Sequence, residues 1–205
     1  MNPILIAFVG VLVVPLFVAS WRLSVYGLAA QGLLMAWISY DLHPELESLD
    51  WIQMIDLVVV RGFGAPIALF VVLRRQGASA RNDVIPPNLM SWTLAIALVL
   101  VAFRFADMLV PVDGDPHSFV AAASAGVLLG LLVLATQTGP FSQMVGALRI
   151  ENGIAMFELG GHHDPAMQAA QTVILVATIL MFRWYLKTLP RASTAKVSAV
   201  EGMIR

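Results

Sequence analysis

Long apolar stretches separated by short polar connections dominate this chain. A helix needs about 20 apolar residues to cross a hydrocarbon core of about 30 Å. Seven stretches approach that length, at residues 3–20, 23–41, 51–73, 89–111, 118–137, 141–159 and 166–186. The pattern predicts an all-α polytopic bundle of seven transmembrane helices in a single domain, residues 1–190, followed by a flexible cytoplasmic tail at 191–205.

The connections between these stretches alternate in charge, and the alternation predicts an orientation. Short cytoplasmic connections of membrane proteins carry an excess of Lys and Arg. The basic residues here follow the first, third and seventh stretches: Arg22, Arg74, Arg75, Arg81, Lys187, Arg191, Lys196 and Arg205. The other connections are acidic, with Asp41, Glu45, Glu47, Asp50, Asp113, Asp115 and Asp164. The N-terminus is therefore expected outside and the C-terminus inside, and the first stretch, which has no Lys or Arg before Trp21, is expected to be a retained helix rather than a secretory signal.

Composition supports this class of protein and excludes several functions. The chain is 59% hydrophobic and 12% charged, with a mean hydropathy of +0.83, which is incompatible with a soluble globule. Its net charge of −1 and the lack of a basic face argue against a nucleic-acid partner. With no cysteine, it has no disulfide and no thiolate-bound iron–sulfur cluster of its own. No phosphate loop, nucleophilic serine arrangement or dinucleotide fingerprint is present, so the chain is expected to have no active site of its own.

The sixth stretch, residues 141–159, is the most polar and contains the candidate chemistry. A carboxylate near the middle of a bilayer costs about 2.5 to 3.5 kcal/mol on insertion scales, so it persists where it is paired, hydrated or used. Glu151 and Glu158 are separated by about 700° of helical rotation and roughly 10.5 Å of rise, which places both on one face. The two acids indicate a proton path, and this stretch must be shielded from lipid by neighbouring helices.

Arg61 lies near the middle of the third stretch and also needs an anion or water, because a guanidinium cannot deprotonate. Asp56 is five residues earlier, about 140° around an α-helix, and is expected to be a poor partner. We therefore predict that Arg61 approaches Glu151 and favours its ionised form. The alternative is that Arg61 only locks helices together.

Three further charged residues have structural explanations. Arg104 and Asp107, three residues apart, are expected to form a local pair that anchors the fourth helix. Arg149 lies about 160° around the helix from Glu151 and is expected to reach another anion or to snorkel to the cytoplasmic headgroups.

The histidines are not expected to form a metal site. His162, His163 and Asp164 form an exposed turn without helical ligand spacing, so no metal is predicted there, although imidazoles near Glu158 would respond to pH. His43 and His117 are placed in outer loops and are given no role.

Small residues and prolines predict local geometry. The glycines Gly62 and Gly64 in the third helix, and the small residues at 121–126 in the fifth, should allow close helix approach. Pro15 and Pro66 should kink the first and third helices.

An internal match predicts a tandem repeat of three helices, unless the short similarity is coincidental. The residues 31–35 (QGLLM) align with 152–156 (NGIAM), each in the second helix of a three-helix group. Residues 1–73 would then repeat as 118–186, with 89–111 as a connector, and both copies would run in the same direction.

The motif from Leu148 to Glu158 (LRIENGIAMFE), followed by a short outer loop and a final helix that ends in Arg183, resembles the component E subunits of hydrogenase-4 and related group 4 membrane complexes. The last three helices are also similar to the K subunit of NADH:quinone oxidoreductase and to the C subunit of Mrp antiporters. In this resemblance Glu151 matches a glutamate in the family's line of membrane charges. Gln171 stands where an acid is expected, so either Glu158 takes over that step or the line is broken here.

The resemblance implies a non-catalytic membrane-arm subunit in a bacterial or archaeal cytoplasmic (inner) membrane. Its partners would be antiporter-like subunits, with any NiFe centre and iron–sulfur clusters held by other subunits and no cofactor in this chain. Proton or cation translocation would then involve Glu151, Glu158 and Arg61, with Arg104, Asp107, Arg149 and Gln171 as supporting groups. The alternatives are a structural scaffold between antiporter-like subunits, a subunit of an Mrp-type antiporter, and an independent small transporter.

Overall fold

A computed structural model describes residues 3–18, 21–42, 48–76, 89–110, 115–137, 139–161 and 165–188. Within these ranges the chain is helical, without strands, and forms seven rods at the seven predicted positions. The all-α prediction is confirmed for this part of the chain. The elements are α1 (Pro3–Val13), η1 (Val14–Leu16), α2 (Trp21–Leu42), α3 (Ser48–Ile55), η2 (Asp56–Gly64), α4 (Ala65–Gln76), α5 (Leu89–Leu109), α6 (Asp115–Thr136), α7 (Pro140–Leu159) and α8 (Pro165–Thr188).

Five of the rods are long and apolar enough to cross a membrane. These spans are Arg22–Leu42, Trp51–Val71, Leu89–Leu109, Pro116–Thr136 and Ala166–Tyr185. The first rod is apolar but shorter, Pro3–Leu16. The rod α7 is not among the five, because its polar side chains lower its hydropathy. The five spans indicate a multi-pass membrane protein.

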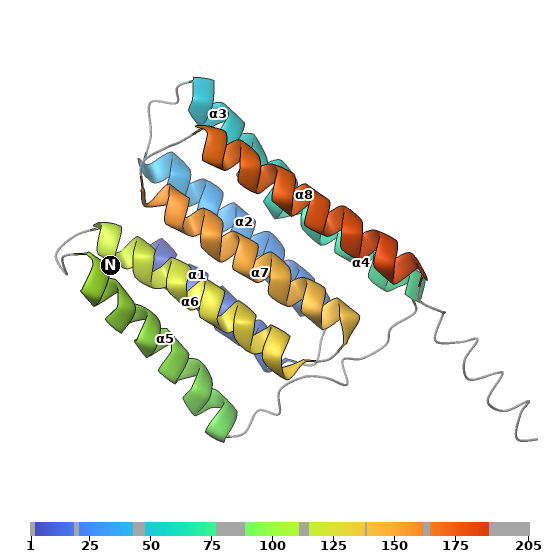
Figure 1. Cartoon of the computed structure of the whole chain (residues 1–205), viewed down its shortest axis with the longest axis horizontal. Coiled ribbons are helices and arrows are strands. Elements are labelled where there is room, and N and C mark those ends of the chain that lie inside the picture. The colour runs from blue at the N-terminus through green and yellow to red at the C-terminus, as the bar shows by residue number, and fades with distance from the viewer. Residues whose placement is uncertain are drawn as a thin grey trace, which may run out of the picture.

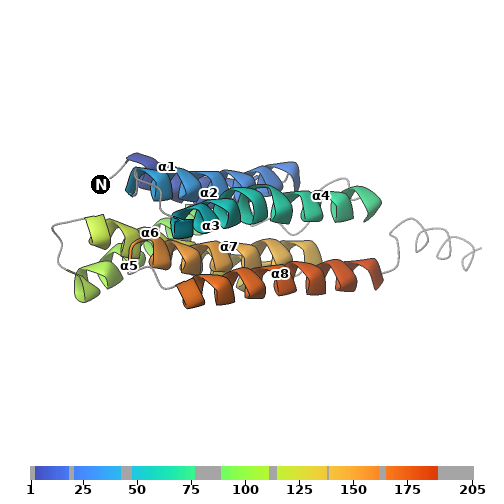
Figure 2. The ribbon, with the colours of Figure 1, turned by 90° about the horizontal axis from the view of Figure 1, so that it is seen from above.

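The rods form two layers, which Figure 2 shows edge-on. One layer contains α1, α2 and the continuous rod α3–η2–α4, and the other contains α5, α6, α7 and α8. Across the layers α1 packs on α6, α2 on α7 and α4 on α8, while α5 packs on α6 at one edge (Figure 1). The polar rod α7 is thus covered by α2, α6 and α8, which confirms that its neighbours shield it.

Glycine contacts bring pairs of rods unusually close together. A Cβ on Gly32 of α2 would lie 2.5 Å from the main-chain nitrogen of Gly62 in η2. In the other layer, a Cβ on Gly126 of α6 would lie 3.2 Å from the Cα of Gly153 in α7. The close approaches predicted for Gly62 and for the small residues of α6 are therefore confirmed.

The two prolines act differently from each other. Pro15 ends the first rod: α1 stops at Val13 and a single 3₁₀ turn follows, so the predicted helix over 3–20 is too long. Pro66 follows a π-helical segment, in which the N–H of Ala65 donates to the carbonyl of Val60 five residues earlier. A proline cannot donate to the carbonyl four residues before it and its ring clashes with that carbonyl, so a widened helix before Pro66 relieves the conflict.

Candidate functional site: a buried charge cluster

Arg61 lies within the π-helical segment η2 and is only 2% exposed. Its Nε donates to Oδ2 of Asp56 at 2.9 Å, and Asp56 is also buried. The expectation that Asp56 is a poor partner for Arg61 is wrong. That expectation assumed α-helical geometry, whereas the i→i+5 pattern of a π-helix brings residues five apart toward the same side.

The same guanidinium reaches α7 from the other layer. Arg61 Nη1 donates to the main-chain carbonyl of Glu151 and to Oδ1 of Asn152, each at 3.2 Å. Asn152 in turn donates through Nδ2 to Oε1 of Gln31 in α2 at 3.1 Å. Gln31, Asp56, Arg61 and Asn152, all buried, form what we call the buried charge cluster, which joins three rods.

The predicted approach of Arg61 to Glu151 is confirmed, and the hydrogen bond between them is made to the main chain of Glu151. Arg61 does face the interface with α7, where it was expected. The Glu151 atom that it binds is the carbonyl oxygen of the main chain, and the half-buried side chain takes no part in that hydrogen bond. Glu151 therefore stands beside the cluster, and Asn152 supplies the side-chain contact.

The cluster mainly holds a permanent positive charge, that of Arg61, in a fixed position. Arginine has five donors and does not release its proton in proteins, so Arg61 cannot pass a proton onward. Its positive charge is balanced by Asp56, and the amides of Asn152 and Gln31 extend the hydrogen bonds into α2. The Glu151 carboxyl, one residue from Asn152, is a neighbouring group outside the cluster that can exchange a proton.

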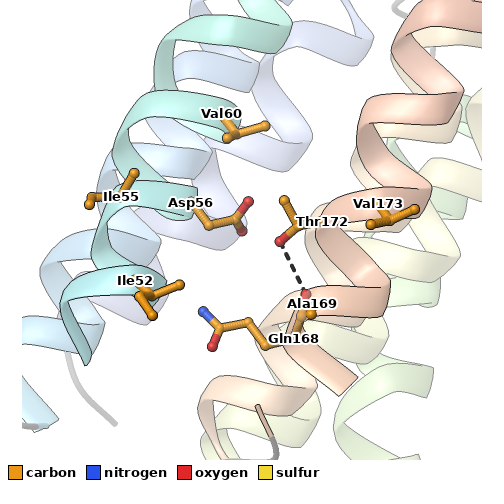
Figure 3. A pocket seen from close by; sticks show the side chains of 8 residues that line it. All are labelled: Ile52, Ile55, Asp56, Val60, Gln168, Ala169, Thr172 and Val173. Atoms are coloured by element: carbon orange, nitrogen blue, oxygen red, sulfur yellow. Dashed lines mark hydrogen bonds between the residues drawn. The ribbon is translucent and has the colours of Figure 1, made fainter. Parts of the chain in front are cut away.

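Two polar atoms of the cluster have no hydrogen-bond partner in the described part of the chain. They are Oδ1 of Asp56 and Nε2 of Gln31, both buried. Asp56 also lines a crevice of about 460 Å³ between α3–η2 and α8 (Figure 3). Burying a polar group without a hydrogen bond costs free energy, so each such atom requires an explanation.

The structure also places three other candidate residues. Glu158 is half-buried like Glu151, in agreement with their shared face of α7. Gln171 is buried on α8. Arg149 is 1% exposed, so the alternative that it snorkels to the headgroups is wrong: it lies in the packed interior of the bundle.

At the opposite edge of the bundle, Arg104 and Asp107 form the predicted local pair on α5, with Nη1 and Oδ2 3.5 Å apart. The Arg104 side chain is 86% exposed. His117 lies 2.8 Å from Asp107, between Nε2 and Oδ1, and is buried in the first turns of α6. The placement of His117 in a loop without a role is therefore wrong: it joins α5 to α6.

The predicted turn at His162, His163 and Asp164, like His43, lies outside the described residues. Within the described ranges no three His, Cys, Asp or Glu side chains gather as a metal site would require.

Comparison of the chain with protein-family models, with curated protein sequences and with solved structures finds no match.

Two members of the cluster, Gln31 and Asn152, were not predicted from the sequence. Gln31 and Asn152 appeared only as aligned positions of the internal match, yet they hydrogen-bond to each other. An available signal was their polarity at the middle of otherwise apolar stretches, where a buried amide needs a partner.

Proposed function

We propose that this chain is a non-catalytic membrane-arm subunit of an energy-converting oxidoreductase complex of the hydrogenase-4 or complex I type, in a bacterial or archaeal cytoplasmic membrane. The observation that carries the proposal is the buried charge cluster beside Glu151, which lies on a rod covered by α2, α6 and α8. Buried charges within a membrane bundle are costly and mark ion pathways or structural anchors. The sequence resemblance of the Leu148–Glu158 motif favours the first of these roles.

In this proposal Arg61 is a fixed positive charge and Glu151 is the group that exchanges a proton. Glu158, about two turns further along α7, is the next carboxyl group in line. Gln171 cannot act as an acid, so Glu158 replaces it. Arg149, Arg104 and Asp107 support the arrangement electrostatically. Electron transfer belongs to partner subunits, which would hold any NiFe centre and iron–sulfur clusters.

The edges of the bundle support binding of large membrane partners. The spans of α5 and α8 lie at opposite edges of the two-layer arrangement, and only 17% of each is buried (Figure 1). Antiporter-like subunits would pack on these apolar edges, and a lateral proton path would continue into them. The same proposal places the N-terminus outside and the C-terminus inside. It also includes the tandem repeat of three helices. The cross-layer pairs α1–α6, α2–α7 and α4–α8 agree with such a repeat.

The test is Glu151→Gln in the native complex, purified with its co-purifying subunits and assayed in inverted membrane vesicles. We expect normal assembly and electron transfer, with acidification of the vesicle lumen lost. Asp41→Asn, the same acid-to-amide change at the exposed end of α2, is the matched control and should pump normally. Unchanged pumping by Glu151→Gln would contradict the proposal.

A structural scaffold between antiporter-like subunits is the second candidate. One observation favours it: Arg61 already makes an ion pair and two further hydrogen bonds, as an anchoring residue would. A scaffold predicts that Glu151→Gln either pumps normally or prevents assembly, so the same experiment separates the two functions.

A further inference from the structure

Three basic side chains gather where α4 and α8 end. The two rods pack on each other, run in the same direction and finish at the same end of the bundle (Figures 1 and 2). Arg74, near the end of α4, and Lys187, near the end of α8, are both exposed. Arg183, one turn before Lys187, is half-buried. Leu73 of α4 and Ile179 of α8 belong to one core cluster, so packing holds the two basic ends beside each other.

The two basic residues of α8 lie on the side of that helix nearest to the α3–η2–α4 rod. Thr172 identifies this side, because it lines the crevice between α8 and η2. Arg183 follows Thr172 by about 1,100° of helical rotation, which is three full turns and about 20°. Lys187 follows it by about 1,500°, or four full turns and about 60°. Both cations therefore lie on the side of α8 that adjoins the rod carrying Arg74.

These positive charges have no carboxylate to balance them in the part of the chain that the structure describes. Residues 21–28, 70–76 and 180–188 form this end of α2, α4 and α8 and contain no Asp or Glu. None of the three basic side chains forms an ion pair with another described residue. Arg22, exposed at the start of α2, adds a further cation to the same end. This end of the bundle therefore attracts anions.

The depth of the three residues corresponds to the headgroup layer of a bilayer. The span of α8 ends at Tyr185, and Lys187 lies about 3 Å beyond that end along a helix. The span of the neighbouring rod ends at Val71, and Arg74 lies about 4.5 Å beyond it. Headgroups extend about 5 to 7 Å beyond the hydrocarbon on each side. Trp184, 69% exposed, is an aromatic anchor of the kind enriched at this level.

The anion that every phospholipid offers at this depth is its phosphate. A guanidinium binds phosphate oxygens through two parallel hydrogen bonds, and a Lys ammonium adds a compact charge. Zwitterionic headgroups carry a cation of their own, which several unbalanced basic residues would repel. Anionic headgroups lack that cation, and each Lys or Arg near an anionic surface contributes attraction. The charge of the site therefore selects an anionic phospholipid.

We propose that the ends of α4 and α8 bind the headgroup of an anionic phospholipid of the phosphatidylglycerol type. The phosphate lies between Arg74 and Arg183, with Lys187 beside it. The acyl chains lie against Val176 and Leu180, which are exposed on the same side of α8. The site does not depend on the proposed role of Glu151, and its test leaves that role untouched.

The test uses the full chain in phosphatidylcholine nanodiscs that contain a small amount of phosphatidylglycerol with a photoactivatable diazirine near the start of an acyl chain. We expect saturable labelling that maps to residues 70–76 and 176–188. Unlabelled phosphatidylglycerol should remove this labelling, whereas the same amount of zwitterionic phosphatidylethanolamine should leave it unchanged. Equal competition by the two lipids, or labelling that does not saturate, would overturn the proposal without any variant. Competition by inorganic phosphate would also overturn it, because the ligand would then be free phosphate.

Two double variants of α8 separate charge from helix packing. Arg183→Gln/Lys187→Gln should weaken labelling by about 25-fold, since each basic residue near an anionic surface contributes about fivefold in affinity. Arg183→Lys/Lys187→Arg keeps both charges and should retain most of the labelling. Arg104→Gln removes an exposed cation from α5, at the opposite edge of the bundle, and is the control that should label normally. Equal labelling of the two double variants would refute the site.

Discussion

Two Arg–Asp pairs in the described part of the bundle differ in almost every physical respect. Arg104 and Asp107 are three residues apart on α5, 3.5 Å from each other, with the arginine side chain 86% exposed at one edge. Arg61 and Asp56 are five residues apart, 2.9 Å from each other and buried between the two layers. The exposed pair follows from α-helical spacing alone. The buried pair exists because η2 is a π-helix, and it lies beside the candidate functional group.

The comparison indicates that the free-energy cost of removing one charge depends on whether the pair is exposed or buried. At an edge, a pair can be solvated or exchange partners, so losing one member costs little. Between layers, each charge depends on the other, and removing one leaves an uncompensated charge. The following substitutions test this contrast, beginning with the largest expected effect.

Replacing Arg61 with Met leaves the Asp56 carboxylate buried without its counter-ion. We expect the free energy of unfolding to fall by about 3–5 kcal/mol, measured by SDS titration in mixed micelles. The double variant Asp56→Leu/Arg61→Met, which removes both charges, should recover most of this loss. Arg104→Met is the matched control. An equal loss of unfolding free energy in that variant would show that the exposed and the buried pair contribute equally to stability.

Gly32→Ala tests the backbone contact that holds α2 against η2. The added methyl group would meet the main chain of Gly62 at 2.5 Å, so the rods must separate and the cluster with them. Overpacking of this kind should lower the free energy of unfolding by about 1–3 kcal/mol, which SDS titration would also measure. Gly10→Ala on α1 meets nothing within 4 Å, so the same change there should be neutral or stabilise by about 0.4–1 kcal/mol. Similar outcomes at both glycines would refute the close contact.

Asn152→Ala tests whether the side chain of Asn152, rather than that of Glu151, holds Arg61. It removes an acceptor from Arg61 and a donor from Gln31, and should cost about 1–3 kcal/mol of unfolding free energy. Glu151→Gln keeps the main-chain carbonyl that Arg61 binds, so stability should change by less than about 1 kcal/mol. A larger effect at Glu151 would mean that its carboxylate is the true partner.

Asp107→Asn should have the smallest effect. It weakens the contacts to Arg104 and His117 at the α5–α6 edge, where we expect a loss of about 0.2–1 kcal/mol. Raising the salt concentration should reduce this loss further, because exposed ion pairs are screened. If Asp107→Asn lowered the free energy of unfolding as much as Arg61→Met does, the exposed and the buried pair would not differ in their contribution to stability.

The sequence by itself determined the all-α architecture, the positions of the seven rods and the need to shield the stretch at 141–159. Each of these follows from local hydropathy, which requires no knowledge of neighbours. The Arg104–Asp107 pair was equally predictable, because three residues of α-helix bring two side chains together wherever the helix lies.

Only the tertiary structure decided how the buried charges are paired. The π-helical segment before Pro66 places Asp56 beside Arg61, and the packing of α7 on α2 brings Asn152 to Gln31. The packing of the rods also buries Arg149, whereas the sequence equally allowed its side chain to reach the exposed headgroup region. These contacts depend on helix winding and on the rotation of one rod against another, and residue spacing along the chain specifies neither quantity.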